Sequence, residues 1–109
     1  MPGQLRRGIP WTVVVVHAAI VGLSVVALVV VSTVYYTPDA NIGAGLVLMW
    51  IAALGLPWSL PILTGSVQIP ETSPAWLQAG VFVLCAVMNV LVHAGIVFAV
   101  HRMRRPSQR

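Results

Sequence analysis

The sequence predicts an all-α fold: a membrane-embedded bundle of three transmembrane helices, the middle one kinked by proline. Hydrophobic residues make up 59% of the chain and charged residues only 7%, whereas a soluble domain carries about 25% charged residues. The apolar residues form three long runs without strand-like alternation, which favours membrane helices. Because so few charges cannot cover a water-soluble surface, lipid is the expected solvent for a single domain, residues 1–109.

The first predicted helix spans about residues 9–36. Its valine-rich run covers about 28 residues, or roughly 42 Å of helix, more than the ~30 Å hydrocarbon core requires. Trp11 at one end, and Tyr35 with Tyr36 at the other, fit the aromatic belts of the two interfaces. The run is too long for the h-region of a cleaved signal peptide, so we expect a retained helix.

The middle predicted helix spans about residues 38–63 and contains Pro57 and Pro61. A start at Pro38 allows a helix of about 28 Å before Pro57, whereas a start at Ile42, with Asn41 as N-cap, allows only about 22 Å. The first alternative crosses the bilayer with a kink, and the second dips in and returns. The high apolarity of the segment favours the crossing.

Each proline of the pair removes a backbone N–H from the helix. The carbonyls of Ala53 and Pro57 therefore lose their usual donors, and in lipid they need other partners. Ser59 and the indole of Trp58 are the nearest donors in the sequence.

The third predicted helix spans about residues 74–102. Ser73 and Pro74 suit its N-cap and first helical position, and Trp76 suits an interface. A basic tail, residues 101–109, follows, in which we expect His101 to be solvated.

Arginines mark both ends of the chain and set the expected topology. The predicted contacts with lipid headgroups are Arg6, Arg7, Arg102, Arg104 and Arg105. Arginines that flank membrane helices prefer the cytoplasm, so an even number of crossings satisfies both ends and three crossings leave one end outside. We expect three crossings and leave their orientation open. Basic residues confined to the two ends do not predict binding of nucleic acid.

A polar intramembrane face is predicted from the residues Gln78, Cys85, Asn89 and His93 of the third helix and His17 of the first. Its first interpretation is hydrogen bonding between helices; the second is a polar pathway or proton relay. With three crossings, His17 and His93 lie near opposite membrane faces. With a two-crossing hairpin they fall in one layer together with Asn89.

Two small-xxx-small pairs, Ala18 with Gly22 and Gly95 with Ala99, allow close helix approach. We expect packing within the chain first and contacts between copies second. Two histidines and an asparagine are a poor ligand set, so no metal and no cofactor is expected. The loops are too short to build an active site, and we expect no enzyme.

The segment from Tyr36 to Leu46, followed by Leu54-Gly-Leu-Pro-Trp-Ser-Leu-Pro61, resembles uncharacterised small multi-pass membrane proteins of actinobacteria such as Streptomyces. These proteins have an Asp-Ala turn after a first apolar helix, a proline-broken middle segment and a basic C-terminus. The resemblance implies a bacterial plasma membrane location and carries no catalytic residue over to this chain.

These observations predict a small integral membrane protein with a structural or regulatory role through helix–helix association. Its expected partners are the lipid bilayer and either a second copy or another membrane protein. The alternative is a homo-oligomeric channel or small transporter that uses the polar face of the third helix.

Overall fold

The computed structural model describes the backbone of residues 2–34 and 41–105, and within these ranges the side chains from Trp11 onward. The described residues form helices and no strand: α1 (Pro2–Val34), α2 (Ile42–Leu54), α3 (Leu60–Leu63) and α4 (Ala75–Met103). The predicted all-α class is confirmed. Two of these helices are long and apolar enough to cross a membrane, over Trp11–Val34 and Ala75–Met103.

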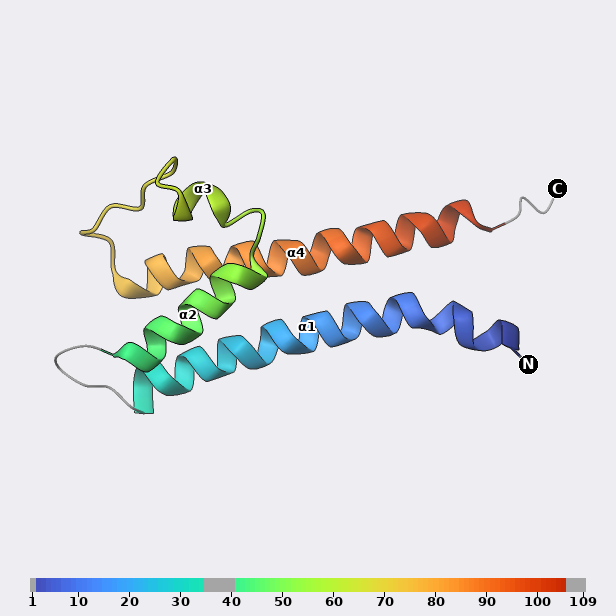
Figure 1. Ribbon diagram of the computed structural model, residues 1–109, viewed down its shortest axis with the longest axis horizontal. Helices are drawn as coiled ribbons and strands as arrows, with labels where there is room; N and C mark the ends of the chain where they lie inside the picture. The colour runs from blue at the N-terminus through green and yellow to red at the C-terminus, as the bar shows by residue number, and fades with distance from the viewer. Residues whose placement is uncertain (1, 35–40, 106–109) are drawn as a thin grey trace.

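The two long helices, α1 and α4, form an antiparallel hairpin (Figure 1). Trp11 lies opposite His101, and His17 lies opposite His93. The residue number increases along α1 from Trp11 to His17, while that of the contacting residue on α4 decreases from His101 to His93. The two helices therefore run in opposite directions, and the N-terminal end of α1 lies beside the C-terminal end of α4. The three-crossing prediction requires these two helices to be parallel and does not describe this arrangement.

The start of α2 is fixed by Asn41, whose backbone is not helical. Its Oδ1 accepts a hydrogen bond from the backbone N–H of Ala44 at 2.9 Å, as an N-cap does. Its Nδ2 donates to the carbonyl of Val31 at 2.8 Å, which ties the start of α2 to the last turns of α1. The later of the two predicted starts, at Ile42, is therefore confirmed. Pro38 lies outside the described residues.

The predicted continuous helix over residues 38–63 is wrong where the structure describes it, because α2 ends at Leu54. Gly55 comes so close to α4 that a Cβ on it would lie 2.8 Å from the Cβ of Cys85. The chain then turns through a cis Leu56–Pro57 peptide. It returns through α3, which contains Pro61, toward the end at which α2 begins (Figure 1). The prolines therefore lie in a chain reversal and not in a kinked helix.

Local bonds satisfy the backbone of this reversal. The carbonyls predicted to be orphaned accept turn bonds: that of Ala53 from the N–H of Leu56 at 3.2 Å, and that of Pro57 from the N–H of Leu60 at 3.1 Å. Ser59 is a donor, as predicted, but to a different carbonyl. Its fully buried hydroxyl donates to the carbonyl of Ala52 at 2.6 Å.

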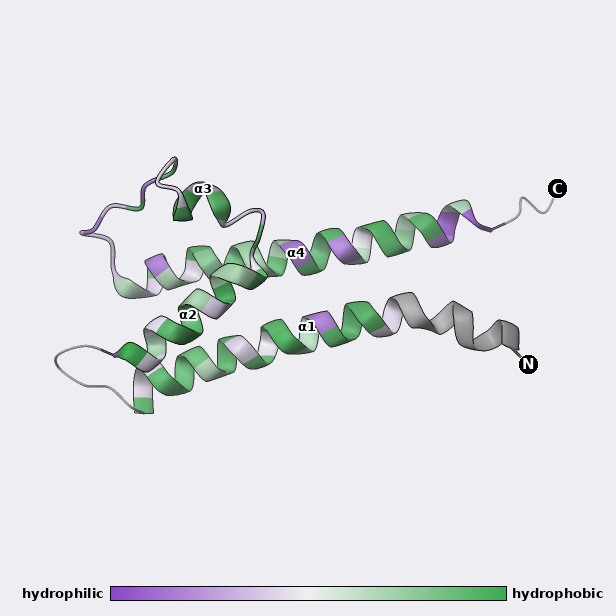
Figure 2. Cartoon of the chain, in the orientation of Figure 1, coloured by the Kyte–Doolittle hydropathy of each residue, from purple (hydrophilic) through white to green (hydrophobic). Residues whose placement is uncertain are grey.

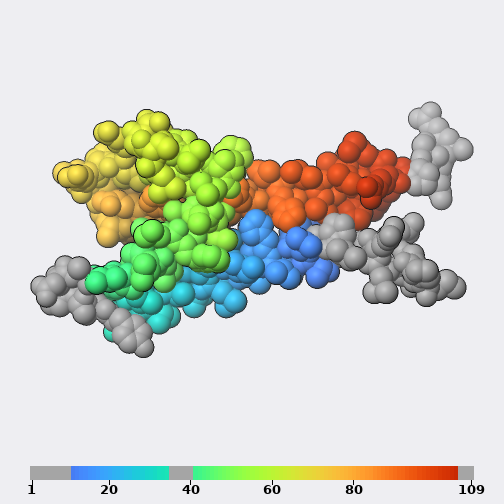
Figure 3. All heavy atoms as spheres, viewed as in Figure 1, coloured from blue at the N-terminus to red at the C-terminus, as the bar shows by residue number. Residues whose placement is uncertain are grey.

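The molecule is elongated, with extents of 64 × 30 × 18 Å. The core cluster consists of Val21, Leu28, Ile51 and Ala86. Figure 3 shows α2 and α3 over the half of the hairpin away from the termini, so that α1 and α4 lie directly side by side in the other half.

Most residues of the two long helices are hydrophobic, with a few hydrophilic ones among them (Figure 2). In the 18-residue apolar stretch taken from each helix, only 22% is buried in α1 and 17% in α4. Large side chains such as Leu23, Leu84 and Phe98 are exposed. A helix that is apolar all round suits either a protein core or a bilayer, and here most of that surface lies outside the core.

Candidate functional site in the seam between the long helices

The centre of the candidate site is a pair of histidines, one from each long helix. The Nδ1 atoms of His17 and His93 lie 3.3 Å apart. Their ring centroids are 5.5 Å apart and the rings are tilted by 47°. A hydrogen bond between two Nδ1 atoms requires one ring to carry the proton and the other to offer its lone pair. The antiparallel alternative of the sequence prediction brings these two residues together.

Asn89 lies one turn before His93 on α4 and holds the tip of α2. Its Nδ2 donates to the carbonyl of Leu54 at 2.6 Å and to the carbonyl of Leu56. Both carbonyls lie where the helix ends and lack intrahelical donors. Asn89 therefore makes the predicted hydrogen bonds to another helix segment, but its partners are backbone carbonyls and not side chains. These bonds join α4 to the chain reversal.

The other two members of the predicted polar face do not join this network. Cys85 is a buried free thiol against Gly55, where it acts as a small packing residue. Gln78 donates from Nε2 to the carbonyl of Ser73 at 2.8 Å, at the far end of α4. Helical periodicity places all these residues on one side of α4, but their partners differ along its length.

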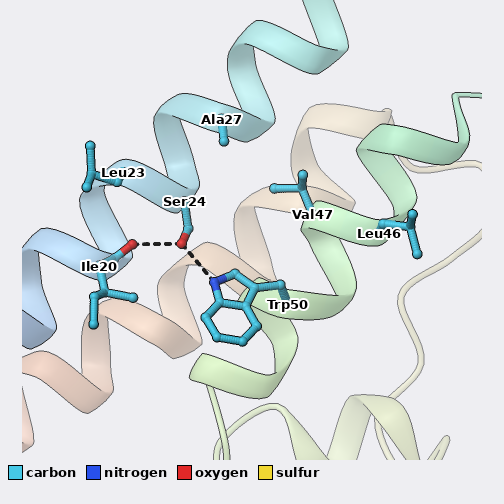
Figure 4. A pocket seen from close by; sticks show the side chains of 7 residues that line it. All are labelled: Ile20, Leu23, Ser24, Ala27, Leu46, Val47 and Trp50. Carbon is cyan, nitrogen blue, oxygen red and sulfur yellow. Dashed lines mark hydrogen bonds between the residues drawn. The ribbon is translucent and has the colours of Figure 1, made fainter.

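A further interhelical hydrogen bond, between Ser24 of α1 and Trp50 of α2, was not predicted. The indole Nε1 of Trp50 donates to Ser24 Oγ at 3.0 Å, and this hydroxyl donates to the carbonyl of Ile20 at 2.7 Å (Figure 4). The bond lies at an open groove of about 470 Å³. The lining residues are Ile20, Leu23, Ser24, Ala27, Leu46, Val47 and Trp50. Ser24 was visible as a rare polar residue in an apolar run, but nothing in the sequence indicated its partner.

The prediction that His101 is solvated is wrong. Its ring stacks over Trp11 with centroids 6.1 Å apart and an interplanar angle of 15°. Its Nε2 is buried without a hydrogen-bond partner among the described residues. The antiparallel hairpin explains this, because it brings the first apolar turns of α1 against the last turn of α4.

The basic residues gather at the same end of the hairpin. Arg102, Arg104 and Arg105 are exposed where α4 ends. Arg6 and Arg7 belong to the first turns of α1, beside that end, and their side chains lie outside the described ones. Of the two acidic residues of the chain, Glu71 belongs to the connection between α3 and α4, at the opposite end, and Asp39 lies outside the described residues.

The small-xxx-small pairs face outward. A Cβ added at Gly22 or at Gly95 would meet no atom within 4 Å, and Ala18 and Ala99 are exposed. The expected packing of these pairs within the chain is therefore wrong, because α1 and α4 meet along other faces. The second expectation, contacts with another molecule, stays a prediction.

Among the described residues, no three His, Cys, Asp or Glu side chains lie close enough to hold a metal ion. Comparison of the chain with protein-family models, curated proteins and solved structures finds no match. The arrangement allows His17 and His93 to share a proton between their imidazoles and allows Asn89 to cap backbone carbonyls.

Proposed function

We propose that this chain is a non-enzymatic membrane protein that acts through helix–helix association. In this proposal α1 and α4 cross the bilayer, and α2 with α3 enters from one side and returns. The span Trp11–Val34 of α1 has 24 residues and the span Ala75–Met103 of α4 has 29, which correspond to about 36 and 43 Å of helix and exceed the ~30 Å core. The exposed apolar surface of these two helices is the observation that carries the proposal.

Two crossings fit the middle segment better than three. The helix α2 has 13 residues, or about 20 Å, which is too short to cross alone. Irregular backbone is tolerated at membrane depth only where protein covers its polar groups. The caps that Asn89 and Ser59 place on carbonyls of this segment meet that requirement.

The orientation follows from the arginines. Two crossings put both basic ends on one side, and the preference of arginine for the cytoplasm makes that side the cytoplasm. Each arginine near an anionic leaflet contributes about 1 kcal/mol of attraction. The resemblance to small actinobacterial membrane proteins supports a bacterial plasma membrane.

The partner in this proposal is a second copy or another membrane protein. Small outward residues let another helix approach closely, and the open space at Gly22 and Gly95 leaves room for one. The channel alternative has less support, because its polar residues are already bonded within one chain. Asn89 holds Leu54 and Leu56, and His93 faces His17.

Reporter fusions after residues 40, 68 and 109 test the crossings. We expect the first two positions outside and the last one inside. Positions 40 and 68 on opposite sides would mean that the middle segment crosses, and would overturn the two-crossing topology.

Crosslinking in native membranes tests the association. Gly22→Ile and Gly95→Ile should each reduce crosslinked complexes without unfolding the chain. Gly80→Ile is the matched control, since Gly80 also has open space but stands one turn from the bulky Trp76 and Leu84. Recovery of the wild-type chain only as an uncomplexed monomer would contradict the association.

A further inference from the structure

All three histidines of the chain lie in one stretch of the hairpin. We define the terminal seam as Trp11, Val14 and His17 of α1 with His93, Val97 and His101 of α4. Val14 and Val97 are buried there, and α2 and α3 lie over the other half of the hairpin (Figure 3). Among the described residues, the terminal seam is therefore closed by α1 and α4 alone, through Trp11, two valines and three histidine rings.

The His17–His93 contact tolerates one added proton but not two. With both rings neutral, one Nδ1–H donates to the other Nδ1 across 3.3 Å. One added proton leaves a charged donor facing a neutral acceptor, which is a stronger hydrogen bond. A second added proton leaves two donors and two positive charges face to face, and the bond is replaced by repulsion.

Among the described residues, none of the helices α1 to α4 contains an acidic side chain that could offset a second charge on the pair. On α1 the other charged residues are Arg6 and Arg7 at its start, and on α4 the residues beyond His101 are arginines. The helices α2 and α3 contain no charged residue and no histidine. The remaining titratable group of α4 is Cys85, two turns from His93 and packed against Gly55. Glu71 belongs to the connection at the opposite end, and Asp39 lies outside the described residues.

We propose that His17 and His93 form a proton-binding site that opens the terminal seam when both rings are charged. The proposal rests on the two-crossing hairpin of the proposed function. The half of the hairpin braced by α2 stays closed, because its contacts are apolar or involve groups that do not titrate near neutral pH. Acidification thus separates the two basic ends and leaves the rest of the fold in place.

Pulsed electron–electron spin resonance in liposomes tests this on the full chain. Spin labels at Val13 and Phe98 report on the terminal seam, and labels at Val26 and Leu84 report on the braced half; all four positions are exposed. Cys85→Ala removes the native thiol and keeps the Cβ that Gly55 packs against. Between about pH 8 and about pH 5, the Val13–Phe98 distance should lengthen by about 5 Å, half a helix diameter. The Val26–Leu84 distance should not change.

Two variants identify the sensor. The double variant His17→Leu/His93→Leu should keep the Val13–Phe98 distance constant over this pH range, whereas His101→Leu should preserve the lengthening. A constant wild-type distance, or a lengthening that persists in the double variant, would overturn the proton site. Widely separated labels at Val26 and Leu84 already at the higher pH would instead overturn the hairpin and, with it, the proposed topology.

Discussion

Replacing Asn89 by leucine should destabilise the chain reversal after α2. The change removes the donor to the carbonyls of Leu54 and Leu56 and leaves two polar groups beside apolar side chains. A lost hydrogen bond of this kind costs about 1 kcal/mol, so the free energy of unfolding should fall by about 2 kcal/mol. Leucine has a similar volume, which keeps the packing contribution small.

The measurement is the free energy of unfolding in lipid bicelles, together with hydrogen exchange of residues 54–60. Exchange there should speed up roughly 30-fold, the factor that corresponds to about 2 kcal/mol. Thr33→Val is the matched control, because Thr33 donates only to a carbonyl of its own helix, that of Val29, at 2.7 Å. An Asn89→Leu variant as stable as wild type, or no more destabilised than Thr33→Val, would refute the capping role.

Three further experiments have defined outcomes. Gly55→Ala should lower the free energy of unfolding by about 1–3 kcal/mol, because its Cβ would lie 2.8 Å from that of Cys85 and 3.3 Å from the backbone N of Ala86. Gly45→Ala is the control, because a Cβ at Gly45 has open space, and it should leave the free energy of unfolding unchanged. An equal decrease in the free energy of unfolding in both variants would contradict the packing argument. Gly65→Ala should lower the free energy of unfolding by about 1 kcal/mol, because alanine is strained at the φ of +78° that Gly65 adopts. An unchanged free energy of unfolding would contradict this backbone strain. In a double-mutant cycle, Ser24→Ala and Trp50→Phe should show a coupling of about 0.6–1.7 kcal/mol, and additive effects would exclude their hydrogen bond.

The fold class and the two long helices could be predicted because composition and unbroken apolar length determine them. The middle segment could not be decided in this way, because hydropathy is the same for a helix that crosses and one that turns back. Two local features set the length of α2. The cap at Asn41 delays its start, and Gly55, at its end, leaves room for Cys85 of α4 to approach closely.

The candidate site could be predicted in part. The residues His17, Asn89 and His93 stood out as rare polar groups in apolar runs, and their meeting depended only on helix direction. The carbonyl partners of Asn89 could not be foreseen, since every residue carries a carbonyl and only the end of α2 selects which ones need a donor. His101 was misplaced because its neighbours in the sequence are basic, whereas its neighbour in space is Trp11.

The placement of α2 and α3 over only one half of the hairpin makes the molecule a wedge (Figure 3). In the proposed orientation the broad half occupies the outer leaflet, and the inner leaflet accommodates little more than two helices. The protein then occupies a larger cross-sectional area in the outer leaflet than in the inner leaflet. Such an inclusion favours membrane that is convex toward the outside, so several copies gathered in one place would shape the bilayer around them.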